Sequence, residues 1–60
     1  MGYTKQLMLS VIDLMRANTD PDYIKLYLSI TLHLAPGDPK IDQYYDQILT
    51  QYQESIKGSN

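Results

Sequence analysis

Cysteine, tryptophan and phenylalanine are all missing from this chain of 60 residues. The lack of cysteine excludes disulfides and thiolate metal sites, and the single histidine, His33, excludes a histidine-rich metal site. A chain this short buries only ~60% of the surface that its unfolded form exposes, so small domains often rely on disulfides, a metal or a partner subunit. Oligomerisation is the reinforcement that remains, and we expect no cofactor.

Basic residues and long apolar runs are also scarce. Five lysine and arginine residues against seven acidic ones give a net charge of −2. This balance argues against nucleic-acid binding and against a basic membrane-surface helix. No apolar run approaches the ~20 residues that span a bilayer, and Asp13 and Arg16 interrupt the pattern of a signal peptide. We therefore expect a soluble, cytoplasmic protein that does not bind membranes.

Two segments, residues 4–18 and 39–57, carry apolar residues at the spacing of an amphipathic helix. The second has the cleaner pattern, because glutamine and acidic residues fill its opposite face. We expect its buried face to consist of Ile41, Tyr44, Tyr45, Ile48, Leu49, Tyr52 and Ile56.

Aspartate followed by proline opens the second and third segments, at Asp20 and Asp38. Aspartate is a good N-cap, and proline fits the first position of a helix. A proline at position 36 limits the second segment. These signals predict helices at residues 4–18, 21–34 and 39–57, with a frayed tail at 58–60. We expect residues 1–60 to form a single all-α domain, a three-helix bundle or helical array that oligomerises, with a tightly packed monomer as the alternative.

The middle segment is ambiguous, because residues 24–34 read IKLYLSITLHL, with an apolar residue at every second position. Such alternation is typical of a half-buried strand. The alternative fold is therefore α-β-α, in which residues 23–34 of two molecules pair as an intermolecular two-stranded ribbon. The Asp-Pro start, the Pro-Gly stop and the lack of a second strand in the chain favour a helix.

As a helix, the middle segment would be apolar on almost every side, with two apolar stripes. The first stripe consists of Tyr23, Leu26, Tyr27, Ile30 and Leu34, and the second of Ile24, Leu28, Leu32 and Ala35. The first stripe recurs at a constant offset in the predicted buried face of the last helix, where Tyr45 and Ile48 correspond to Tyr27 and Ile30. Only Lys25, Ser29 and His33 form a consistent polar stripe. A helix that is apolar all round is normally buried, so part of this surface is expected to contact another chain.

Methionine and arginine in the first helix are typical of adaptable interfaces. The predicted interface residues are Met8, Leu9, Ile12, Met15, Arg16, Ile24, Leu28 and Leu32. A core position for the stripe formed by Met8, Ile12 and Met15 stays open as the alternative. The sequence predicts a non-enzymatic module that binds another protein or a second copy of itself. It would act as an adaptor, inhibitor or regulator of a larger protein, and its composition suits a phage- or plasmid-encoded accessory protein.

Catalytic signals are weak. His33 has no neighbouring nucleophile at triad spacing, and Asp42 and Asp46 lie one turn apart without a second set of ligands. We therefore expect no catalytic or metal site. One alternative function is a dimeric DNA-binding regulator, built either on the ribbon or on a helix-turn-helix that presents Lys25, Ser29 and His33. Another is a small-ligand-binding oligomer with a pocket lined by Tyr27, His33 or Tyr44.

Overall fold

Three helices make up the computed structural model of the chain, which describes residues 3–58. They are α1 (Lys5–Arg16), α2 (Pro21–Leu32) and α3 (Pro39–Gly58). The described part of the chain contains no strand, so the all-α prediction is confirmed and the ribbon of residues 23–34 is not supported. Of the predicted tail, Gly58 belongs to α3, and residues 59–60 lie outside the described residues.

Capping side chains fix the start of each helix. The Thr4 hydroxyl accepts a hydrogen bond from the Leu7 N–H at 3.2 Å. The Asp20 carboxylate accepts the Asp22 N–H at 2.9 Å, and the Asp38 carboxylate accepts the Lys40 N–H at 2.9 Å. Each bond satisfies a backbone donor that has no partner within the helix. The two Asp-Pro signals therefore act as the sequence indicated.

The second helix ends at Leu32, two residues before the predicted end at residue 34. His33 adopts the left-handed conformation, with φ 57°, and the Leu34 N–H then bonds to the Ser29 carbonyl at 2.9 Å. The Ser29 hydroxyl in turn donates to the Leu34 carbonyl at 2.7 Å. This is a Schellman-type ending in which a histidine occupies the place that glycine usually takes. Local backbone hydrogen bonds, and not Pro36, terminate α2.

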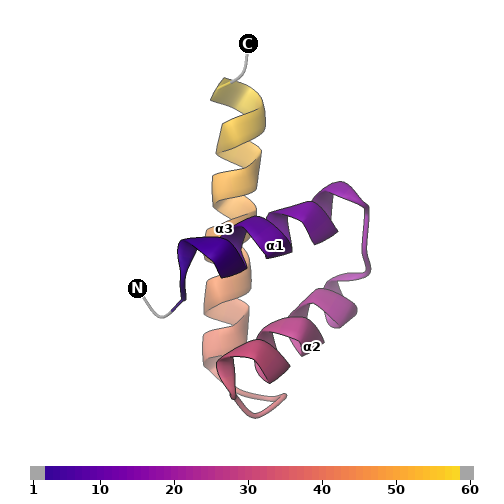
Figure 1. Ribbon diagram of the computed structural model, residues 1–60, viewed down its shortest axis with the longest axis vertical. Coiled ribbons are helices and arrows are strands. Elements are labelled where there is room, and N and C mark those ends of the chain that lie inside the picture. Colours follow the sequence, from indigo (N-terminus) through magenta and orange to yellow (C-terminus); the bar gives the residue numbers. More distant parts are fainter. Residues whose placement is uncertain (1–2, 59–60) are drawn as a thin grey trace.

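Figure 1 shows α1 and α2 lying across α3, whose C-terminal part extends beyond both of them. Side chains from all three helices meet where they cross. The buried apolar residues are Leu7, Val11, Met15, Ile24, Leu28, Ile41 and Ile48. Of the predicted buried face of α3, Ile41 and Ile48 are buried, the tyrosines and Leu49 are half-buried, and Ile56 is exposed. None of the described helices is long and apolar enough to cross a membrane.

Ile30 and Ile48 correspond in the sequence pattern but differ in burial, since Ile48 is buried and Ile30 is exposed. We expect Ile48→Val to lower the free energy of unfolding by about 1 kcal/mol, because it deletes a buried methylene group. The same change at Ile30 should alter it by less than about 0.5 kcal/mol. Urea unfolding followed by circular dichroism measures both. Equal losses would contradict the difference in burial between the two positions.

The left-handed backbone at position 33 gives a second prediction. His33→Gly should raise the free energy of unfolding by about 1 kcal/mol, because glycine has no Cβ to strain at a positive φ. His33→Ala keeps the Cβ and should bring no such gain. Urea unfolding of dilute protein measures the difference. Lower stability in the glycine variant would contradict the assignment of strain to this residue.

Candidate protein-binding surface

One side of α2 exposes a continuous set of large apolar residues, here called the α2 outer face. It consists of Tyr23, Leu26, Tyr27 and Ile30, spaced so that they share one side of the helix. Tyr23, Leu26 and Ile30 are 58%, 50% and 66% exposed, and Tyr27 is half-buried. Exposed apolar residues that gather in this way mark an interaction surface more often than isolated ones do.

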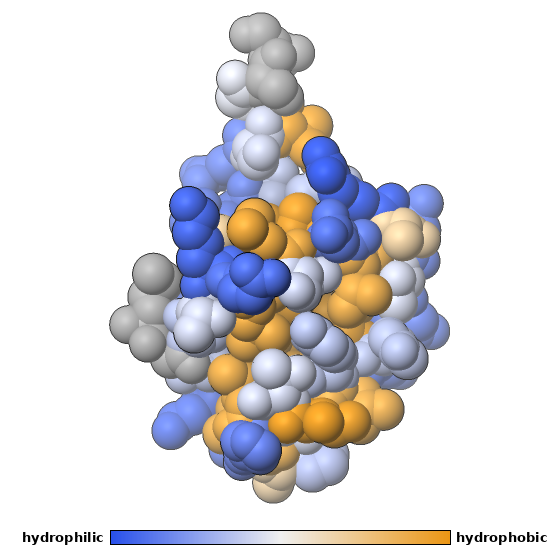
Figure 2. Space-filling model, viewed as in Figure 1, coloured by the Kyte–Doolittle hydropathy of each residue, from blue (hydrophilic) through white to orange (hydrophobic). Residues whose placement is uncertain are grey.

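The packing of α2 explains why this face is uncovered. Ile24 and Leu28 are 1% and 0% exposed and pack in the core that α2 shares with α1 and α3. Two neighbouring helices cover only part of a helix that is apolar nearly all round. Figure 2 shows hydrophobic residues reaching the surface across the lower part of the molecule, the region where α2 lies in Figure 1.

Shallow hollows lie on and beside the α2 outer face. The four residues of the face enclose a hollow of about 90 Å³. A second one, toward α1, is lined by Ser10, Asp13, Leu14, Tyr23 and Tyr27. A third, toward the loop before α3, is lined by Asp22, Lys25, Leu26, Ser29 and Pro36. The face is therefore a ridge of side chains with depressions that can receive side chains of a partner.

Several predicted interface residues lie in the core instead of at the surface. Met15, Ile24 and Leu28 are buried, so a partner that docks on the folded chain cannot reach them. The core alternative is therefore correct for Met15. Met8, Ile12 and Leu32 are half-buried and pack against the core, whereas Leu9 and Arg16 are exposed. The structure does not bring the predicted residues together as one exposed surface.

The reason is the direction in which the polar stripe of α2 points. The sequence pattern matched the first apolar stripe to the predicted buried face of α3 and left Lys25, Ser29 and His33 as the polar stripe of α2. In the structure Lys25 reaches across to α3, where its Nζ lies 3.1 Å from Asp42 Oδ1, and Ser29 is buried. The polar stripe thus borders the core, and Tyr23 and its neighbours turn outward. Ser29 lies one turn before the end of α2, where its hydroxyl can bond to a backbone carbonyl of the following residues. This position was the signal that Ser29 could be buried.

Lys25 joins α2 to α3 through two contacts. Besides the ion pair with Asp42, its Nζ lies 5.2 Å from the centre of the Tyr45 ring. The hydrogen bond to Asp42, and then the charge of Asp42, raise the pKa of Lys25 above its usual value of 10.5. The resulting stabilisation is present at neutral pH, where lysine is charged in both the folded and the unfolded chain. It is lost as the pH rises through the raised pKa.

The ends of the α2 outer face differ in charge. Asp20 and Asp22 lie exposed at its N-terminal end, and His33 is exposed at its C-terminal end. The single arginine of the sequence, Arg16, pairs with Asp13 at 3.9 Å on α1. The face is therefore apolar along its length, with exposed carboxylates at one end and an exposed imidazole at the other.

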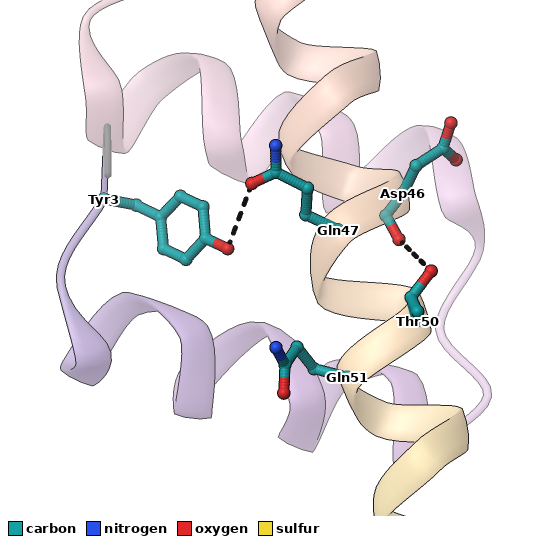
Figure 3. Close-up of a pocket in the computed structure, with 5 residues that line it drawn as sticks. All are labelled: Tyr3, Asp46, Gln47, Thr50 and Gln51. Atoms are coloured by element: carbon teal, nitrogen blue, oxygen red, sulfur yellow. Dashed lines mark hydrogen bonds between the residues drawn. The ribbon is translucent and has the colours of Figure 1, made fainter.

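A separate polar depression of about 410 Å³ lies between Tyr3 and α3, as Figure 3 shows. The Tyr3 hydroxyl donates to Gln47 Oε1 at 3.3 Å, and the Tyr3 ring meets Tyr44 edge-on with centroids 5.3 Å apart. The Thr50 hydroxyl donates to the Asp46 backbone carbonyl at 2.9 Å. The two Tyr3 contacts fasten residue 3 to α3, whereas the Thr50 bond lies within α3.

The residues of the other predicted sites are placed apart. Tyr44 packs on Tyr3, whereas Tyr27 lies beside Tyr23 on the α2 outer face, so the two do not line one pocket. Asp42 pairs with Lys25. Among residues 3–58, no group of three histidine, aspartate or glutamate side chains is arranged to hold a metal ion.

No protein-family model, curated protein or solved structure matches this chain. The α2 outer face is therefore identified from the physical properties of its own residues. Its defining property is that Tyr23, Leu26 and Ile30 are exposed on one side of a helix.

The contacts of Lys25 lead to a third prediction. Lys25→Gln should lower the Tm at low salt, because it removes the ion pair with Asp42 and the contact with Tyr45. The difference from wild type should shrink at high salt, since salt screens partly exposed pairs. Lys40→Gln is the matched control, because it also replaces a lysine by glutamine. It should not lower the Tm, since a cation in the first turn of α3 is unfavourable. A loss that is independent of salt would contradict an electrostatic origin.

Proposed function

We propose that this chain is a small non-enzymatic protein-binding module that acts through the α2 outer face. In this role it serves as an adaptor, inhibitor or regulator of a larger protein. The exposure of Tyr23, Leu26 and Ile30 along one helix side supports the proposal. Each of these side chains loses apolar contact with water when a partner covers it, which favours association.

The chemistry of the α2 outer face suits recognition of another helix or of a shallow groove. Apolar residues at this spacing are the anchors that an amphipathic helix presents to a groove. Tyr23 and Tyr27 each combine a large ring with a hydroxyl that stays in contact with water. Tyrosine is also among the residues that most often dominate binding energy at interfaces. The outer face therefore has both apolar anchors and a polar margin.

A DNA-binding role receives less support from the same geometry. Lys25 was the central cation of that alternative, and it is engaged by Asp42 and Tyr45. Arg16 pairs with Asp13. Phosphate contacts by free cations supply most non-specific affinity for DNA. The protein-binding proposal draws on exposed apolar residues, whereas the two cations considered for DNA binding, Lys25 and Arg16, are already paired.

Affinity capture with matched variants tests the proposed surface. Leu26→Glu places a charge in the middle of the α2 outer face and should reduce recovery of the bound protein at least about tenfold. Leu9→Glu makes the same change at a residue of similar exposure, 47%, on α1. This control should leave the recovery unchanged. The captured protein is identified and its affinity for each purified variant is then measured.

The opposite pattern would locate the binding site elsewhere. Loss of binding in Leu9→Glu, with binding retained in Leu26→Glu, would assign the interaction to the exposed side of α1. Circular dichroism of both variants confirms that each remains helical, so that a loss of binding reflects the surface and not unfolding.

A further inference from the structure

The four residues of the α2 outer face have the same spacing when they are read in either direction along the helix. Tyr23 and Ile30 occupy its ends, and Leu26 and Tyr27 lie at equal distances from its centre. We infer that a second copy of this chain covers the face, with the two α2 helices antiparallel about a two-fold axis between Leu26 and Tyr27. The inference rests on the proposed function, because it names the partner of the same surface.

The register of this pair gives complementary contacts. Tyr23 lies opposite Ile30 of the second copy, so that at each end an aromatic ring covers an aliphatic side chain. Leu26 and Tyr27 are about 100° apart around the helix and point to opposite sides of the axis. Each therefore lies beside its own counterpart. The same patch is used by both copies, which is the property of a two-fold interface.

Charge favours the antiparallel direction. A parallel pair would gather Asp20 and Asp22 of both copies at one end, and four carboxylates would repel one another. The antiparallel pair instead places these carboxylates at the end that holds His33 of the second copy. It also sets the two helix dipoles in opposite directions, which is the favourable arrangement. The distribution of charge along α2 thus selects one of the two possible directions.

The exposed area sets the strength of the pair. A buried tyrosine contributes about 150–250 Å², so the partly exposed residues of the α2 outer face offer roughly a few hundred Å² per copy. A stable complex buries about 800 Å² per partner. Since the α2 outer face offers less than this area, we expect a weak and reversible dimer. Such a pair is dilution-sensitive and can exchange for a better-fitting partner.

Sedimentation across protein concentrations from about 10 µM to about 1 mM measures this equilibrium. The mean mass of the wild-type chain should rise toward that of a dimer. Leu26→Glu should raise the Kd at least about tenfold, because two glutamates then lie side by side at the axis. Leu9→Glu, on α1, should leave the Kd unchanged. Dimerisation that is lost in Leu9→Glu but kept in Leu26→Glu would overturn the inference.

Cross-linking tests the direction of the helices, and the lack of native cysteine makes each introduced thiol unique. Tyr23→Cys and Ile30→Cys are made as separate variants and oxidised alone and as a mixture at about 1 mM. The two positions are about 10 Å apart along the helix, too far for the same-position disulfide in an antiparallel pair. The mixture should give several times more linked dimer than either variant alone. Leu9→Cys is the control and should link no more than background.

Two outcomes would overturn the inference. Linking of each variant alone, as strongly as in the mixture, would show a parallel or random encounter. A wild-type chain that stays monomeric at about 1 mM, together with no linking in the mixture, would exclude the second copy. If capture of another protein still depended on Leu26 in that case, the proposed function would stand with a different occupant.

Discussion

The rotation of α2 about its own axis determines which residues of this chain are core and which are surface. Ile24 and Leu28 anchor that rotation, because their burial directs one side of α2 into the space shared with α1 and α3. Lys25 and Ser29, on the adjoining side, then find their partners at Asp42 and at the Leu34 carbonyl. A helix turned by half a revolution would bury Tyr23 and Ile30 but would leave the interhelical pair of Lys25 and Asp42 unmade.

The arrangement of α1 and α3 explains why the outer side of α2 is uncovered among residues 3–58. Two helices pack on α2, and α3 extends beyond both α1 and α2 without turning back over them (Figure 1). The uncovered face follows from an apolar helix that two described neighbours cover on only part of its circumference.

The sequence predicted the features that depend on neighbouring residues. Asp20 and Asp38 cap their helices as expected, and the choice of helix over strand for residues 23–34 is correct. The end of α2 was misplaced, because a histidine in the left-handed conformation carries no signal comparable to glycine. The buried and exposed apolar stripes of α2 were also predicted the wrong way round, for a different reason. Periodicity fixes which residues share a face, but only the tertiary contacts decide which face turns inward.

The apolar spacing that α2 shares with α3 led to a wrong assignment of the buried side of α2. Ile30 and Ile48 correspond in sequence, yet one is exposed and the other is buried. The polar partners on the two helices differ, since the side of α2 that bears Lys25 faces α3 whereas the polar side of α3 faces water. Similar apolar spacing therefore does not imply similar burial. The polar residues of a helix therefore matter as much as its apolar residues, because an interhelical ion pair can accompany a change in the side of the helix that faces the core.

Tyrosine suits a surface that is covered only part of the time. In the free chain the Tyr23 ring is more than half exposed, and its hydroxyl can bond to water. Phenylalanine at this position would present the same ring without that polar group. A partner that covers the ring gains the apolar contact, and binding stabilises the folded chain by mass action. The stability of this small domain and the occupancy of the α2 outer face are therefore linked through one equilibrium.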